Sequence, residues 1–209
     1  GLFHTAFRVP SRAALGDALA RVRERWRLDG ASDHRVSEAL YLADPEDNGV
    51  EIYRDYPRAE WPERADGTVG MTTDPLDVDG VAAAAGGADD APVETDIGHV
   101  HLEVSSLDAA RGFYGDALGL ATRASISGAL FLAAGGYHHH VGANTWRGRT
   151  AQAGGRGLAW FEVVVPGTDA LDAARARLAD HGVDVVETDA GLAATDPDGI
   201  EVRLRAETA

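Results

Sequence analysis

The sequence predicts an α+β fold made of paired βαβββ modules, whose strands form curved mixed β-sheets with flanking helices. One reason is an internal repeat: the glycine-led segments 1–10 and 157–166 match, and each is followed by an amphipathic helix and then by β-prone segments. A second reason is a more divergent copy of the same pattern from residue 97. Each copy has only about 50 residues, too few to bury a sheet alone, so the modules are expected to pair.

The first module is expected at 1–57. A strand over the first residues leads to Ser11, a favoured N-cap, and then to a helix whose apolar residues recur at helical spacing. A strand at 39–43, a turn at 44–49 and a final strand at 50–53 complete the module. Because three modules are an odd number, we expect this one to be the second half of a first domain whose first half is absent.

The second module is expected at 97–147. It follows a linker at 58–96 that is rich in Pro, Gly, Asp and Ala and carries one short helix near 76–85. The expected elements of the module are a strand at 97–104, a helix at 106–117 closed by Gly119, and strands at 130–134 and 137–145.

The third module is expected at 156–205, with Thr168 and Asp169 as N-cap candidates for its helix. A strand at 192–195, a turn at 196–199 and a strand at 200–204 end it. This turn is expected to be two residues shorter than the turn at 44–49. When the two modules are aligned with a gap of that length, Glu201 matches Glu51.

The charge balance narrows the function classes. The 19 basic residues, all of them arginine, and the 34 acidic residues leave a net charge of −15, which disfavours nucleic acid and anionic membrane surfaces as partners. No apolar run approaches the roughly 18 residues that a membrane span requires. An acidic, lysine-free composition resembles that of cytoplasmic proteins from extreme halophiles, although GC-rich codon usage also replaces lysine by arginine. With no cysteine, any metal must be held by His, Asp or Glu.

Three residues are candidate metal ligands: His4, Glu51 and His99. The two histidines lie in the first strands of their modules, and Glu51 lies in an apolar final strand, where an unpartnered carboxylate is costly. Each could be an ordinary strand residue, but their matched places in repeated modules favour a 2-His-1-carboxylate site, which suits non-haem Fe(II). His101 lies on the same face as His99 and is either a neighbour of the site or its replacement as ligand.

Two further features qualify this site. Trp160 stands where the first module has His4, so the last module lacks an imidazole and Glu201 is expected to be structural. Three adjacent histidines, His138, His139 and His140, occupy a β-prone segment. On a strand, His139 would face away from the other two, and one of the three is a plausible acid/base beside a bound substrate.

These features together resemble the vicinal-oxygen-chelate superfamily of glyoxalases, bleomycin-resistance proteins and extradiol dioxygenases. The resemblance rests on the modules, the strand-one histidines, the Asp-Pro-x-x-Asn-Gly-x-Glu segment ending at Glu51 and the histidine run. The segments 36–42, 53–55 and 135–140 are similar to those of bacterial catechol 2,3-dioxygenase-like proteins. The module order departs from that of the family. The module with His4 and Glu51, which match the family's second ligand and its carboxylate, precedes the module with His99, which matches the first ligand.

The resemblance implies a set of roles. His99, His4 and Glu51 would be the metal ligands, His139 the acid/base, and Tyr41 and His34 hydrogen-bonding partners of the substrate. It further implies Fe(II) as cofactor, a catechol or substituted catechol and O2 as substrates, and a homo-oligomer. Related modules also form isomerases or lyases that use Mn(II), Ni(II) or Zn(II), and metal-free drug-binding proteins, so both remain alternatives.

Overall fold

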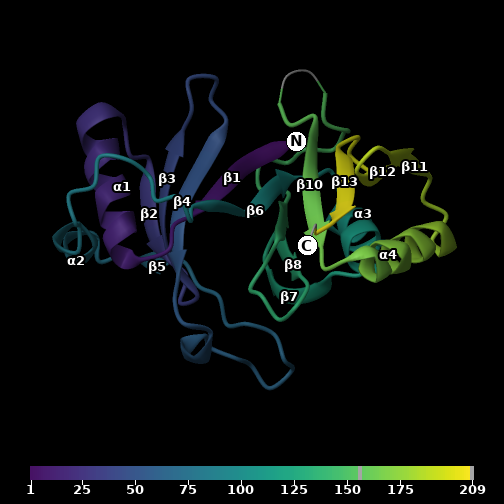
Figure 1. Ribbon diagram of the computed structural model, residues 1–209, viewed down its shortest axis with the longest axis horizontal. Coiled ribbons are helices and arrows are strands. Elements are labelled where there is room, and N and C mark those ends of the chain that lie inside the picture. Colours follow the sequence, from purple (N-terminus) through teal and green to yellow (C-terminus); the bar gives the residue numbers. More distant parts are fainter. Residues whose placement is uncertain (155–156, 208–209) are drawn as a thin grey trace. The chain divides into compact units, whose positions relative to one another are not determined.

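The computed structural model describes residues 1–154 and 157–207 and divides into two compact units (Figure 1). The N-terminal unit comprises residues 2–101, and the C-terminal unit comprises Gly1 and the chain from residue 102 onward. Residue 156, the expected start of the third module, lies outside the described residues. Curved mixed sheets carrying few helices confirm the predicted α+β class.

The N-terminal unit is a mixed sheet with strand order β5-β2-β3-β4-β1-β6. Strands β1 and β4 run parallel, whereas β2 and β3, and β3 and β4, are antiparallel hairpin neighbours. The helix between β1 and β2 is the crossover that turns the chain around and allows the parallel pair to form. The strands are β1 (Leu2–Arg8), β2 (Gly30–Asp33), β3 (Ser37–Ala43), β4 (Gly49–Asp55), β5 (Asp74–Pro75) and β6 (Asp96–Glu103), of which residues 96–101 belong to this unit.

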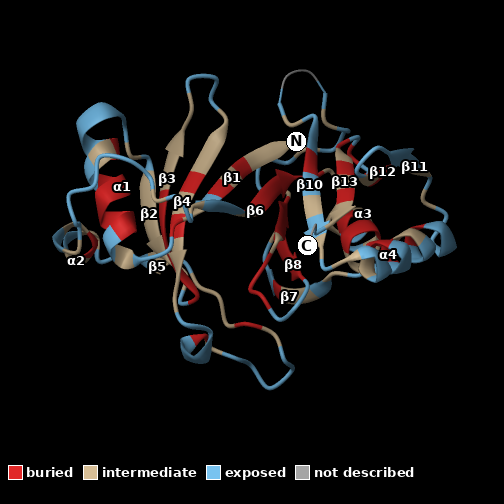
Figure 2. Ribbon diagram, in the orientation of Figure 1, coloured by how far each residue is buried: buried red, intermediate tan, exposed pale blue. Residues whose placement is uncertain are grey.

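Helix α1 (Arg12–Arg25) covers this sheet. The Ser11 side chain accepts the Ala14 N–H and begins the helix as expected. Its apolar stripe, including Leu15 and Leu19, is buried against Leu40 of β3, and Figure 2 shows this stripe in red along α1.

The segment 58–96 contains a 3-10 turn η1 (Arg58–Glu60), strand β5 beside β2, and the expected short helix, α2 (Val78–Ala83). Helix α2 packs directly on α1, and Val81 joins the core of the N-terminal unit. The part of this segment that forms β5 and α2 therefore adds buried surface to the unit.

The C-terminal unit contains two further strand–helix–strand patterns. In the first, α3 (Leu107–Ala110) continues as a π-helical segment, η2 (Arg111–Ala117), and ends near Gly119, as the sequence predicts. Its strands β7 (Ala121–Ile126), β8 (Ala129–Ala133) and β9 (Val141–Asn144) form antiparallel neighbours. In the second, α4 (Thr168–Asp180) covers a four-stranded sheet of order β10-β13-β12-β11. Its strands are β10 (Trp160–Val165), β11 (Val185–Thr188), β12 (Gly191–Thr195) and β13 (Glu201–Ala206).

Two local expectations are wrong. Residues 137–140 are not strand, because β9 begins only at Val141, and so the strand-based orientation of the three histidines does not apply. Helix α4 begins at Thr168, one residue earlier than an N-cap at Thr168 predicts and two earlier than one at Asp169. Gly167, at φ +85, takes the N-cap position without a side-chain bond. Glycine reaches this positive φ at little cost, which explains why it precedes the helix.

The two Asp-Pro turns have the same length, which corrects the expected gap. Each turn spans five residues, between the pairs Ala43↔Gly49 and Thr195↔Glu201. In both, the leading aspartate accepts the N–H groups two and four residues later: Asp44 from Glu46 and Asn48, and Asp196 from Asp198 and Ile200. Glu201 therefore corresponds to Gly49, and the residue at the place of Glu51 is Arg203.

Candidate metal centre

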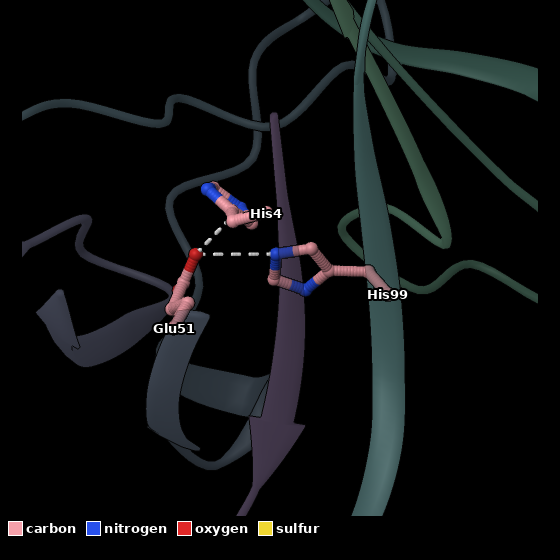
Figure 3. A group of neighbouring side chains, drawn as sticks. All are labelled: His4, Glu51 and His99. Atoms are coloured by element: carbon pink, nitrogen blue, oxygen red, sulfur yellow. Dashed lines mark hydrogen bonds and ion pairs between the residues drawn. The ribbon is translucent and has the colours of Figure 1, made fainter. Parts of the chain in front are cut away.

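Three buried side chains of the N-terminal unit converge on one point (Figure 3). The Glu51 Oε2 atom lies 2.9 Å from His4 Nε2 and 3.3 Å from His99 Nε2. One ligand atom from each residue lies within 4.8 Å of the others, a spacing that allows all three to bind one ion. These side chains come from β1, β4 and β6, and the donor set of two imidazoles and one carboxylate fits a divalent metal.

Strand geometry explains the convergence. Glu51 of β4 lies opposite Ala6 of β1, and His4 lies two residues earlier on the same face of β1. Strand β6 is the neighbour of β1 on its other edge, which brings His99 to the same face as His4. The first strand of the second repeat therefore completes a site that the first repeat begins.

The charges of the site favour an ionised carboxylate. Burial by itself would raise the pKa of the Glu51 carboxyl, but the attraction of His99 and His4 and their hydrogen bonds hold that pKa well below its usual range. The result is a buried anion with two imidazole partners. The Glu51 carboxylate can therefore bind a metal cation without first losing a proton.

His34 and Tyr41 form a hydrogen-bonded pair next to this cluster. The His34 ring bonds the Thr72 carbonyl through Nδ1 and the Tyr41 hydroxyl through Nε2, both at 2.6 Å. Because a carbonyl only accepts, a neutral His34 carries its proton on Nδ1 and accepts the Tyr41 proton at Nε2. Burial, the charge of Glu51 and a hydrogen bond to Glu51 raise the pKa of Tyr41 well above its usual value. The single Tyr41 proton thus has two competing acceptors.

The structure distinguishes the two histidines of β6. His99 joins His4 and Glu51, whereas His101 lies outside this group and places its buried ring edge-on to His4, with ring centroids 4.9 Å apart. Burial, followed by the positive charges of His4 and His99, lowers the pKa of His101 well below its usual value. His101 is therefore a neutral neighbour that packs against one ligand.

Tyr53 is a site neighbour that the sequence analysis did not single out. It is fully buried, and its ring centroid lies 4.9 Å from that of His99. A Cβ atom on Gly98 would overlap the Tyr53 hydroxyl, which explains the glycine before His99. The alternation of β4 could have indicated Tyr53, because it lies two residues after Glu51 on the same face.

Acid is expected to destabilise the metal-free protein through His101. The unfolded state binds a proton near the ordinary pKa of 6.5, whereas the folded state resists it, so protonation favours unfolding as the pH falls below that value. The free energy of unfolding should fall by up to about 1.4 kcal/mol per pH unit from this residue. Urea unfolding at several pH values should show a flatter dependence in His101→Gln than in the exposed-residue control His181→Gln. An unchanged slope in His101→Gln would contradict this assignment.

Among its described residues, the last repeat carries no equivalent ligand set. Trp160 pairs with Glu201 as His4 pairs with Gly49, so Trp160 and Arg203 stand at the places of His4 and Glu51. The Arg203 guanidinium lies 3.9 Å from the Trp160 ring centroid and is bonded to Glu201 at 2.6 Å. A fixed cation at this position opposes metal binding, and Glu201 is the ion-pair partner of Arg203.

The histidine run lies in the C-terminal unit, in the loop between β8 and β9. His138 and His139 are buried, and their Nδ1 atoms lie 2.7 Å apart, so one of the two donates to the other. The His139 ring also meets Phe131 edge-on, at 5.0 Å between centroids. His140 stacks on Tyr137 and is less buried.

Comparisons with known proteins agree with this architecture. The family model described as glyoxalase/bleomycin resistance protein/dioxygenase superfamily matches residues 96–204. A Bacillus subtilis (strain 168) protein named catechol-2,3-dioxygenase is 43% identical over 204 residues, covering 94% of this chain and 72% of that protein. A crystal structure of a provisional dioxygenase from Bacillus subtilis shares the fold, with a TM-score of 0.61 at 13% identity. The match covers all of this chain, which spans 62% of that structure's chain. Within the described residues, no helix is both long and apolar enough to cross a membrane.

Proposed function

The chain belongs to the glyoxalase/bleomycin resistance protein/dioxygenase superfamily, and from this membership we propose that it is a non-haem Fe(II)-dependent extradiol dioxygenase acting on catechol or a substituted catechol. The observation that carries the proposal is the convergence of His4, Glu51 and His99. Two imidazoles and one carboxylate leave open positions on one side of a metal, which suits an enzyme that brings together two further molecules. The name of the 43% identical relative supports the same reaction class.

The chemistry of the donors fits the proposed metal. Imidazole nitrogen and carboxylate oxygen are suitable ligands for Fe(II), and the carboxylate is already ionised in the folded protein. When bound, Fe(II) would supply coordination of the diol and electron transfer to O2. His4, Glu51 and His99 would hold it, and His101 would fix the orientation of the His4 ring by packing against it.

Tyr41 and His34 would move and hold a proton beside the substrate. The Tyr41 hydroxyl donates to His34 Nε2 while His34 is neutral, and it becomes free to donate elsewhere once His34 is protonated. The raised pKa of Tyr41 keeps its proton in place at neutral pH. The resemblance to extradiol enzymes assigns the acid/base role to His139, which would give a proton to a substrate oxygen and later recover it.

The function is tested by loading the protein anaerobically with Fe(II) and then adding catechol and air. The expected result is uptake of one O2 for each catechol and a yellow semialdehyde that contains both oxygen atoms of O2. His139→Ala should lower turnover by about 100-fold or more, and His140→Ala, which changes a less buried histidine of the same run, serves as the matched control.

Metal analysis of the purified protein separates this function from its alternatives. Iron with oxygen uptake supports the dioxygenase. Bound Mn, Ni or Zn with no oxygen uptake would instead indicate a glyoxalase-like isomerase or lyase, and a protein that binds no added divalent metal would indicate a metal-free binding protein. Either of the last two results would overturn the proposal.

A further inference from the structure

The residues around strand β5 hold His34, the hydrogen-bond partner of Tyr41, on the side of its ring away from Tyr41. The Thr72 carbonyl oxygen lies 2.6 Å from His34 Nδ1, and the Thr72 N–H donates to the His34 carbonyl at 3.3 Å. The Asp74 Oδ2 atom in turn accepts the Thr72 hydroxyl at 2.9 Å and the Arg35 guanidinium at 3.0 Å. All of these residues lie in the N-terminal unit, so the arrangement is a property of that unit alone.

Three residues, Arg35, Thr72 and Asp74, are named the clamp here. We propose that the clamp keeps the His34 proton on Nδ1 and thereby directs the Tyr41 hydroxyl away from Glu51. Its members are positioning residues, because they act on the metal centre through His34. Their effect on catalysis rests on the proposed function, whereas the place of the His34 proton does not.

The tautomer of His34 decides where the Tyr41 proton points. With its proton on Nδ1, the ring donates to the Thr72 carbonyl, and Nε2 accepts the Tyr41 hydroxyl. With the proton on Nε2, the ring would donate to the Tyr41 oxygen, and the Tyr41 hydroxyl would turn to its other acceptor, Glu51. A carboxylate that accepts this hydroxyl proton binds a metal less strongly. The Thr72 carbonyl opposes that second tautomer, because it would face the unprotonated Nδ1 at 2.6 Å with no proton between them.

Backbone pairing alone gives the Thr72 carbonyl little support. Strand β5 contains only Asp74 and Pro75, and it pairs with the last two residues of β2. Proline has no N–H to donate, so a strand of this length and composition forms few backbone hydrogen bonds. The place of Thr72 beside His34 therefore depends on the bond from its hydroxyl to Asp74.

Arg35 reaches Asp74 from a backbone conformation that non-glycine residues rarely adopt. Its φ is +64°, in the left-handed region, where an arginine is strained. The Asp33 carboxylate stabilises this turn, because it accepts the Arg35 N–H at 2.7 Å and the Tyr56 hydroxyl at 2.9 Å. The residue that follows His34 is thus held by its backbone and by its side chain.

The clamp is expected to add little to the stability of the fold. The Arg35 and Asp74 side chains are 59% and 44% exposed, and an ion pair this exposed contributes little to the free energy of unfolding. Loss of the clamp should therefore change the tautomer of His34 in a protein that remains folded. This expectation separates a positioning role from a structural one.

The first measurement is the tautomer of His34 in the metal-free protein, from the ¹⁵N chemical shifts of its ring at a pH where the imidazole is neutral. His34→Gln identifies the signals. We expect the Nδ1–H tautomer alone in the unmodified protein, and a mixture of both tautomers in Asp74→Ala and in Thr72→Val. The matched controls, Asp66→Ala and Thr68→Val, should keep the single tautomer. They remove a bond of the same kind, since Asp66 accepts the Thr68 hydroxyl at 2.6 Å within the turn at 64–68.

The second measurement is the dissociation constant for Zn(II), a divalent ion without redox chemistry, by titration calorimetry. Asp74→Ala and Thr72→Val should each raise this constant about tenfold, and the two control variants should leave it unchanged. Urea unfolding should give each clamp variant the same midpoint as its control, because the exposed bonds add little stability.

Three results would overturn the proposal. They are a His34 proton on Nε2 in the unmodified protein, clamp variants that behave as their controls do, and clamp variants that unfold where their controls do not. The tautomer is measured without metal or substrate, so it decides the proposal even if the iron-loaded protein leaves catechol unchanged. That last result would contradict only the proposed function.

Discussion

Glu51→Gln is expected to weaken metal binding by roughly 100-fold or more and to abolish oxygen-dependent turnover of catechol. The substitution keeps the size of the side chain but removes the anion that faces His4 Nε2 and His99 Nε2 at 2.9 and 3.3 Å. A neutral amide is a poor ligand for a divalent cation in place of a carboxylate, and the two imidazoles that remain rarely hold a catalytic metal.

The measurement is the rise in melting temperature caused by added metal. A ligand at 100 times its dissociation constant stabilises the folded state by about 2.7 kcal/mol, and this gain should be present in the unmodified protein and lost in Glu51→Gln. Glu103→Gln is a matched control, because Glu103 is buried in the C-terminal unit and outside the ligand group. A metal-induced shift of normal size in Glu51→Gln would show that Glu51 is not a ligand.

Gly49→Ala is expected to destabilise the protein by about 3 kcal/mol and to reduce metal binding at the same time. A Cβ atom at this position would overlap the Phe3 carbonyl oxygen and lie 3.0 Å from the His4 Cβ. Because the overlap is with backbone, no side-chain rotation relieves it, and β1 must move away from β4 at the residue that carries a ligand. Glycine is therefore required here by the close approach of the two strands.

Urea unfolding and metal titration of Gly49→Ala measure the two effects. Gly112→Ala is the control, since a Cβ there meets no atom within 4 Å and the residue lies in the helical segment η2. That control should be neutral or slightly stabilising. A Gly49→Ala protein as stable as the control would show that β1 and β4 can separate without cost.

Much of the fold and of the candidate site could be predicted from the sequence. The residues that indicate it either act on backbone groups close to them in the chain or recur at matching places in the repeats. Ser11 marked the start of α1 and Gly119 the end of the second helix, since both act on backbone groups within one turn. His4, Glu51 and His99 were identifiable because they occupy matched strands of a repeat. The aspartate that begins each Asp-Pro turn likewise accepts backbone N–H groups of residues within the same turn.

Register and strand neighbours required the tertiary structure, because they depend on hydrogen bonds between distant segments. The sequence pattern aligns Glu201 with Glu51, whereas strand pairing places Arg203 there. A shift of two residues along a strand keeps the same face, so the hydrophobic pattern does not reveal it. The run at 137–140 has strand-like residues but lies in the loop between β8 and β9, where the Tyr137 N–H bonds the Ala134 carbonyl three residues earlier in the chain.

The sequence by itself determined the repeated module, its helix caps and the residue types able to bind a metal, because each of these follows from short-range chemistry. Only the tertiary structure decided that β6 lies beside β1, that His99 and not His101 meets Glu51, and that the last repeat holds an arginine where the first holds a carboxylate. The physical reason is that a metal site needs atoms within a few ångströms, and that distance is set by which strand edges pair.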